Sequence, residues 1–232
     1  PAPGNTLKTL TGQLAYGATH NPLTFPNPAV EVKVDWLPAT SLSPAFNCTT
    51  NPPAGVYTET IAGTCYALVA LHFSSKLDPN WLWATFEPQN KTTNPNRCNP
   101  NLYVNCNDPW GSNPASSNGA ATAPTPALVS LMTQAGLPKV FQNYRLVGTE
   151  TVFVNGQNQP IQLGNSFTEF NAGVSPHQAS CITCHHYASV ARTSPPKSGP
   201  CCGTVHIGTP PALPSNLMPV DFSWMLPGMP AK

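Results

Sequence analysis

The chain carries little charge for its length. Of its 232 residues, only ten are Lys or Arg and nine are Asp or Glu, which leaves a formal net charge of +1. A nucleic-acid-binding protein needs a surplus of basic side chains gathered on one face, and charge-driven disorder needs a high net charge with few aromatic residues. The composition argues against both classes, so we expect no nucleic-acid partner.

The chain also lacks any apolar run long enough to span a bilayer, so we expect no transmembrane segment. It does not begin with the basic and apolar regions of a signal peptide, but a mature exported protein would have lost that segment. We therefore expect a bacterial periplasmic or secreted protein whose signal peptide has already been removed.

Proline, in contrast, is abundant, with 29 residues. Proline and the residue before it both avoid the helical region of backbone conformation, so we expect few long helices. Asn-Pro pairs recur without a fixed period and predict turns rather than a repeat. They begin at Asn21, Asn27, Asn51, Asn94, Asn99 and Asn113.

The most informative stretch is Cys181-Ile182-Thr183-Cys184-His185. C-x-x-C-H is the attachment signal of a c-type haem. Two thiols one helical turn apart can each form a thioether to a porphyrin vinyl group, and the adjacent imidazole becomes the proximal iron ligand. We predict one covalent haem c attached through Cys181 and Cys184, with His185 as proximal ligand. The motif would open a short helix that continues through Ala191.

Three other interpretations of the motif remain open. A structural disulfide could join Cys181 and Cys184. A thioredoxin-like redox site would need a βαβ frame, which the proline-containing flanks do not supply. A zinc site could draw on the mixed ligand set that zinc favours, namely Cys181, Cys184, Cys201, Cys202 and His206.

Eight cysteines in all indicate an oxidising compartment. Six of these cysteines lie outside the C-x-x-C-H motif. Six cysteines can form disulfides in fifteen different combinations, and the sequence alone does not choose among them. The shortest loops favour disulfides Cys48–Cys65 and Cys98–Cys106, which would leave a vicinal pair or two reduced thiols. The six cysteines outside the motif are Cys48, Cys65, Cys98, Cys106, Cys201 and Cys202.

Most of the remaining chain has the patterns of strands and loops. Val30 to Trp36 alternates valines with charged residues, which is typical of a half-buried strand. A helix is predicted from Pro126 to Ala135, followed by Gly136. Asn155-Gly156 predicts a tight turn. The expected strands are 30–36, 65–73, 81–87, 144–154 and 159–163, with 76–80 as a hairpin connection and with loops at 1–28, 38–60 and 88–125.

These patterns predict one β-rich α+β domain over residues 1–232. It would have an irregular N-terminal segment over 1–28, long Pro- and Asn-rich loops, disulfides, and a short haem-bearing helix within an attachment segment over 175–206. A small class I cytochrome c has its motif near the N-terminus of an all-α chain. The late motif and the β-rich body exclude that layout.

Several blocks resemble a family of bacterial exported monohaem c-type cytochromes that has no assigned reaction. The order of the blocks is more telling than any one of them. The resemblance implies a periplasmic monohaem protein. The family has a histidine just after Thr-Phe-Glu, where this chain has Pro88 and Gln89, so no ligand role is carried to that position. The resembling blocks are Val30–Leu37, Ala67–His72, Trp81–Glu87, Leu146–Thr149 and Ser180–His185.

The sixth iron ligand decides the chemistry, because a strong ligand favours electron transfer whereas an open site permits peroxide, O₂ or NO chemistry. His72 is one candidate, since it ends an apolar strand where a polar ring needs a partner; alternatively it is a hydrogen-bonded core histidine. Met225 is an alternative sixth ligand, although apolar packing is the more common role of methionine. Weaker candidates as ligands are His177, His186, His206, Met132, Met218 and Met229; Trp81, Trp83, Trp224 and Tyr187 could line the haem, and Glu87 could transfer protons.

We therefore expect a periplasmic electron-transfer cytochrome that exchanges electrons with redox partner proteins. The scarcity of charge is a difficulty, because transient docking often uses charged patches. The alternatives are a haem enzyme of the peroxidase or oxygenase type with an open distal site, and a binding protein stabilised by zinc and disulfides.

Overall fold

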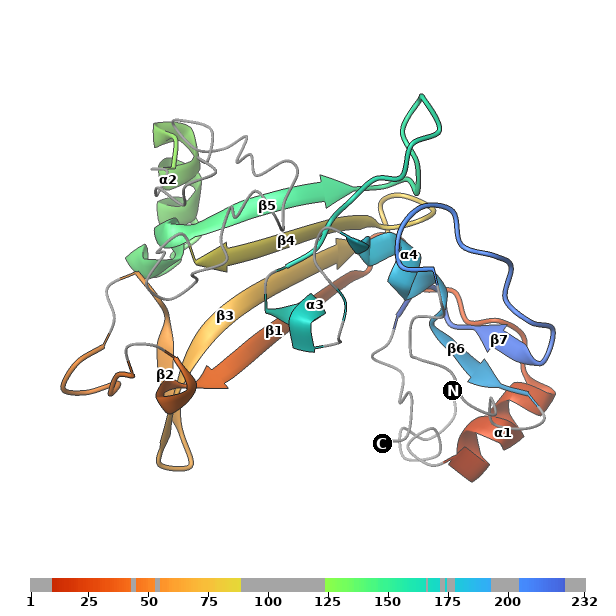
Figure 1. Ribbon diagram of the computed structural model, residues 1–232, viewed down its shortest axis with the longest axis horizontal. Coiled ribbons are helices and arrows are strands. Elements are labelled where there is room, and N and C mark those ends of the chain that lie inside the picture. The colour runs from red at the N-terminus through yellow and green to blue at the C-terminus, as the bar shows by residue number, and fades with distance from the viewer. Residues whose placement is uncertain are drawn as a thin grey trace.

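The computed structural model describes residues 10–42, 45–52, 55–88, 124–165, 167–171, 174, 178–192 and 205–223. Its main feature is a five-stranded antiparallel sheet, with a separate pair of short antiparallel strands at one end (Figure 1). The large sheet consists of β1 (Val30–Pro38), β2 (Thr58–Ile61), β3 (Thr64–Ser75), β4 (Leu82–Pro88) and β5 (Tyr144–Glu150), and the small one of β6 (Ser189–Ala191) and β7 (Leu217–Pro219).

The helices of the described residues are short. They are α1 (Leu10–Thr19), α2 (Pro126–Gln134), α3 (Thr168–Asn171) and α4 (Cys181–His186), with 3₁₀ turns at Ala39–Ser41 and Lys139–Asn143. None of them is long and apolar enough to cross a membrane. The fold is therefore β-rich, as expected, and is not that of an all-α cytochrome.

β3 is the central strand of the large sheet. It pairs with β1 along one side and with β4 and β2 along the other, and β5 extends the sheet beyond β4. Its apolar sequence explains this position, because Ala67, Leu68, Val69 and Ala70 are all buried. The connection from Lys76 to Asn80 joins β3 to β4 as predicted.

β1 shows the predicted alternation, but its charged side faces the rest of the protein and its valine side faces outward, the reverse of a half-buried strand with an apolar inner side. Val30, Val32 and Val34 are 64%, 51% and 40% exposed. The charged residues point the other way: Glu31 accepts a hydrogen bond from Ser223, and Asp35 accepts one from Thr168 of α3. The polar face of the sheet is therefore the face that α3 and the C-terminal segment contact.

The predicted disulfide between Cys48 and Cys65 is confirmed. It joins the segment after β1 to the beginning of β3, where β2 also pairs with β3. The other four cysteines outside the motif, Cys98, Cys106, Cys201 and Cys202, lie outside the described residues.

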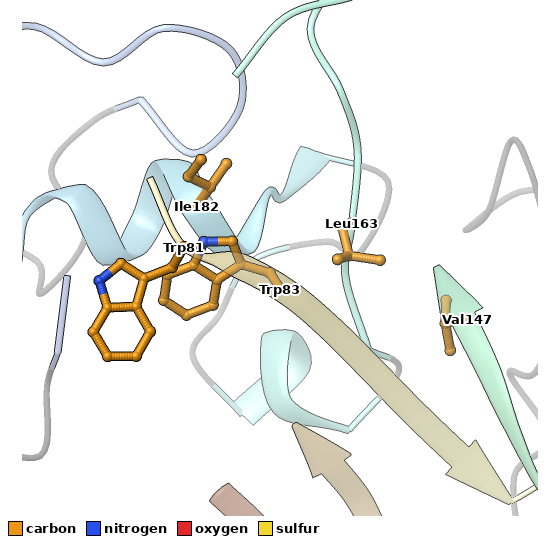
Figure 2. Close-up of a cluster of buried hydrophobic side chains, with 5 residues drawn as sticks. All are labelled: Trp81, Trp83, Val147, Leu163 and Ile182. Carbon is orange, nitrogen blue, oxygen red and sulfur yellow. The ribbon is translucent and has the colours of Figure 1, made fainter. Parts of the chain in front are cut away.

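A buried apolar cluster attaches α4 to the large sheet. It combines Trp81, which directly precedes β4, Trp83 of β4, Val147 of β5, Ile182 of α4, and Leu163 from the segment between β5 and α3 (Figure 2). Burying a side chain of this size contributes about 1.5–3 kcal/mol. A second cluster joins α1 to the small sheet through Tyr16, Leu23, Ala188, Val190, Met218 and Val220.

Four expectations about local structure are wrong. Residues 38–60 are not all loop, because β2 begins at Thr58 and pairs with β3. Residues 1–28 are not wholly irregular, because α1 forms over Leu10–Thr19; Arg192 donates hydrogen bonds to the carbonyls of Gly17 and His20 at its end (2.9 and 3.4 Å). The helix at the motif ends at His186, since residues 189–191 pair as β6. β5 stops at Glu150, and residues 159–163 form only isolated bridges.

Candidate functional site

α4 begins at a capped and buried N-terminus. The side chain of Ser180 accepts a hydrogen bond from the backbone N–H of Thr183 (3.3 Å), the usual role of an N-cap serine. Glu150, the last residue of β5, accepts a hydrogen bond from the N–H of Ile182 (2.7 Å), and its other carboxyl oxygen lies within hydrogen-bond distance of the Ser180 hydroxyl (3.0 Å). The first turn of α4 is thus fixed to the edge of the large sheet. Burial raises the pKa of Glu150 to about 8.

Cys181 and Cys184 lie one turn apart on α4, and both are partly buried without a disulfide. The Sγ of Cys181 lies 3.5 Å from the carbonyl oxygen of Leu163, and the Sγ of Cys184 lies 3.9 Å from that of His206. Burial, together with the charges of Glu150 and Glu169, raises the pKa of Cys181 well above its ordinary value. The Cys181 side chain is therefore a neutral thiol at physiological pH.

His185 ends the motif with one ring nitrogen occupied. Its Nδ1 lies 2.7 Å from the carbonyl oxygen of Phe222. Because a carbonyl only accepts, Nδ1 carries the ring proton and Nε2 keeps its lone pair. Burial lowers the pKa of His185 to about 4, so the ring is neutral at physiological pH. A neutral imidazole oriented by a backbone carbonyl is the state in which histidine binds a metal.

An indole ring packs against the His185 ring, and a second aromatic ring packs against that indole. The centroid of Trp83 lies 4.4 Å from that of His185, and Phe222 lies 6.4 Å from Trp83. The indole N–H of Trp83 donates to the carbonyl of Asn80 (2.9 Å), which fixes the orientation of the ring. Trp83, a candidate for lining a haem, therefore contacts the His185 ring, and the Trp81 ring packs against Trp83 with 6.3 Å between the centroids.

His72 lies on the polar face of the same sheet, with both ring nitrogens occupied. Thr85 accepts an N–H from Asn165 (3.0 Å) and can donate its hydroxyl proton to Nδ1 of His72 (3.0 Å). Nε2 can then donate to Thr168 (2.8 Å), whose hydroxyl hydrogen-bonds to Asp35. Binding of a metal by His72 would break one of these bonds.

The carboxylates near His72 are shifted in opposite directions. Burial alone would raise the pKa of Asp35, but three neighbours hold it at about 2: His72, whose Nε2 also lies 3.5 Å from the carboxylate, the hydroxyl of Thr168 and the charge of Lys33. Burial raises the pKa of Glu169 to about 7. This polar cluster therefore combines a fixed negative charge with a carboxyl group that exchanges its proton near neutral pH.

The other predicted site residues are dispersed. Met218 is fully buried among the side chains that join β6 and β7, and Met132 lies on α2, at the far end of the large sheet from α4 (Figure 1). Glu87 is fully buried, opposite Arg145 on β5. His186 contacts Phe153 and Phe222. His206 contributes its backbone carbonyl, and Met225, His177, Met229 and Trp224 lie outside the described residues.

No sequence pattern points to Glu150 or Asp221 as site residues. Asp221 precedes Phe222, and its side chain forms an ion pair with Lys76. The sequence does show each of them as a lone carboxylate within an apolar stretch of a chain that has few charges. Such a carboxylate, once buried, requires hydrogen-bond donors from the protein. That signal identifies a buried acid but does not reveal its partners, which come from distant segments.

No family model, curated protein or solved structure matches the chain. Within the described residues, no group of three or more His, Cys, Asp or Glu side chains is arranged to hold a metal ion. A haem iron needs only one or two protein ligands, so that finding does not bear on haem. Two of the cysteines in the alternative zinc ligand set, Cys201 and Cys202, lie outside the described residues.

Proposed function

We propose that the protein is a monohaem c-type cytochrome, with Cys181 and Cys184 as the points of covalent attachment and His185 as the proximal iron ligand. The observation that carries the proposal is the state of His185: a buried, neutral ring whose Nδ1–H is held by the carbonyl of Phe222, which leaves Nε2 for a metal. The C-x-x-C-H pattern and the family resemblance support the same assignment.

The surrounding residues fit such a group. The two thiols are free of disulfides and are presented one turn apart on a helix fixed to the sheet. Trp83 packs against the His185 ring and Phe222 packs against Trp83, so these side chains would shield His185 from water if it held the iron of a haem c. A bound haem c would supply reversible one-electron transfer at its iron.

We place this activity outside the cytoplasm, in exchange with redox partner proteins. The Cys48–Cys65 disulfide supports an oxidising compartment. With so few charges in the chain, docking would depend on apolar and uncharged polar contacts more than on charged patches. The proposed association should therefore depend weakly on ionic strength.

A haem enzyme with an open or weakly ligated iron is the second candidate. The cluster of Asp35, His72 and Thr168 favours it, because both nitrogens of His72 are held by hydroxyl groups rather than left free for a metal. In that role the cluster would deliver or accept a proton beside the haem. If His72 or Met225 is instead the sixth ligand, electron transfer is the function.

The test compares His185→Gln with His186→Gln in protein produced with the haem-attachment machinery. We expect wild type and His186→Gln to show the reduced α and β bands of a c-type haem, and His185→Gln to lose the low-spin spectrum or the haem. Absence of a Soret band from the wild type would overturn the proposal. If carbon monoxide leaves the absorption bands of the reduced wild type unchanged, the iron has two strong axial ligands and the function is electron transfer. If carbon monoxide shifts these bands, the iron has an open or weakly ligated position and the function is that of a haem enzyme.

A further inference from the structure

Asp221 joins three segments of the chain that are distant in sequence. Its Oδ2 accepts a hydrogen bond from the backbone N–H of Phe25 (2.6 Å), and its Oδ1 accepts from Nζ of Lys76 (2.5 Å) and Nε1 of Trp81 (3.3 Å). The side chains of Asp221 and Lys76 are only 7% and 13% exposed. Charge-assisted bonds of this kind are roughly twice as strong as neutral ones, so the position of the carboxylate is well defined.

The backbone next to this carboxylate adopts an uncommon conformation. Asp221 and Phe222 both have left-handed backbone angles, with φ of 53° and 65°. Aspartate tolerates this region, but an aromatic residue rarely adopts it. Such strain persists only where the surrounding structure fixes the backbone. The consequence of this turn is that the carbonyl of Phe222 points at Nδ1 of His185, 2.7 Å away.

A backbone hydrogen bond closes this turn, because Ser223 donates its N–H to the carbonyl of Val220 (3.1 Å), and the two flanking residues also fix the path of the chain on either side. Val220 donates its N–H to the carbonyl of Ala188 (3.0 Å), and Ser223 donates its hydroxyl to Glu31 (2.6 Å). Between these two anchors, the side-chain hydrogen bonds of Asp221 are those that reach the connection between β3 and β4, through Lys76 and Trp81. Trp81 packs against Trp83, the ring that contacts His185.

We propose that Asp221 is a positioning residue for His185: by holding the turn, it keeps the Phe222 carbonyl on Nδ1 and so selects the Nδ1–H tautomer. The selection of the tautomer stands on the contacts of this chain; its effect on a metal rests on the proposed function. A hydrogen bond from Nδ1–H makes Nε2 more basic. A more basic ligand favours the oxidised iron, so Asp221 would keep the midpoint potential low.

Asp221→Asn is the informative variant. Asparagine tolerates the left-handed backbone and has almost the same volume as aspartate. The substitution therefore changes the side-chain hydrogen bonds without adding strain to the backbone. However, it has one acceptor oxygen where aspartate has two. Its amide nitrogen must therefore face either the N–H of Phe25 or the donors of Lys76 and Trp81. Glu59→Gln on exposed β2 removes the same charge far from the site and serves as the control.

The first readout needs no haem. In the full chain produced without haem attachment, ¹⁵N NMR of the His185 ring should show the Nδ1–H tautomer in wild type and Glu59→Gln, and a larger share of Nε2–H in Asp221→Asn. The second readout is the midpoint potential of the haem-loaded protein, which should become more positive in Asp221→Asn alone. A folded Asp221→Asn protein with wild-type tautomer and potential overturns the inference.

The two readouts separate the inference from the proposed function. If wild type takes up no haem, the cytochrome proposal fails, and the tautomer measurement still decides the role of Asp221. If Asp221→Asn does not fold, Lys76→Gln replaces it, since glutamine keeps a donor but removes the ion pair. A folded Lys76→Gln protein should change the tautomer in the same direction to a smaller extent, and an unchanged tautomer would then contradict the inference.

Discussion

At the scale of single residues, Glu150 shows how a buried carboxyl can be incorporated into the structure. When protonated, it can donate to Ser180, Ser180 can donate to Thr183 (3.0 Å between the oxygens), and Thr183 donates to the carbonyl of Gly208 (2.7 Å). Every hydroxyl in this chain of bonds then has both a donor and an acceptor role. The arrangement agrees with the raised pKa of Glu150, about 8.

This pKa makes stability depend on pH. Between the ordinary value of 4.5 and about 8, the folded chain holds a proton on Glu150 that the unfolded chain releases. Raising the pH through this window therefore favours unfolding, by at most about 1.4 kcal/mol per pH unit. Glu150→Gln keeps an acceptor for Ile182 and a donor for Ser180 but cannot ionise. We expect its free energy of unfolding in urea to lose this decline between pH 5 and 8.

The comparison that matters is the difference between variant and wild type, because Glu169, with a pKa raised by burial to about 7, also contributes to the decline. Glu59→Gln, an exposed position on β2, controls for the change of net charge and should follow the wild type. Parallel pH profiles of Glu150→Gln and wild type would show that Glu150 is already ionised in the folded protein.

At the scale of elements, α4 is too short to be stable by itself. It spans Cys181–His186, whereas isolated helices shorter than about 12–15 residues are marginal in water. Its stability must come from the Ser180 cap, the Glu150 carboxyl and the apolar cluster around Ile182. The helix that presents the motif is therefore dependent on the large sheet.

Ile182→Ala tests this dependence. Ile182 is 0% exposed and packs with Trp81 and Trp83, so truncation leaves a cavity and should cost about 2–5 kcal/mol of unfolding free energy. Leu131→Ala on α2 is the matched control, because Leu131 is 56% exposed and its truncation should change stability by less than about 0.5 kcal/mol. Urea titrations of the two variants measure both values; equal effects would contradict the role given to the cluster.

An element can be predicted from the sequence when its own residues specify it, but not when it forms through packing against a distant segment. β1, β3, β4 and α2 follow from local patterns: alternation, an apolar run, and the proline and glycine that bound the helix. α1 and β6 depend on one another, since Tyr16 and Leu23 pack on the small sheet, and no local pattern reveals such a partner. The C-x-x-C-H spacing alone identifies Cys181, Cys184 and His185 as candidate site residues. Asp221, in contrast, acts through contacts with Phe25 and Lys76 that only the folded chain brings together.

At the scale of the whole molecule, the large sheet separates two ends with different tasks. The disulfide lies at the first residues of β3, whereas Trp83, which contacts His185, pairs with Ser74 near the last. At about 3.3 Å per residue along a strand, these ends are about 30 Å apart. One end closes a loop covalently, and the other holds the candidate site through hydrogen bonds and packing.

This separation predicts that stability can be lowered without altering the site. Cys48 and Cys65 enclose a loop with a sequence separation of 17, and removing such a crosslink costs about 3 kcal/mol, because the unfolded chain gains freedom. The double variant Cys48→Ser, Cys65→Ser should therefore unfold at lower urea concentration than wild type. Below its unfolding transition it should keep the wild-type ¹⁵N signals of the His185 ring, since the contacts that the structure describes for that ring, with Phe222 and Trp83, lie outside the loop. A changed tautomer in the folded double variant would mean that strain is transmitted along β3, and the two ends would then have to be treated as one unit.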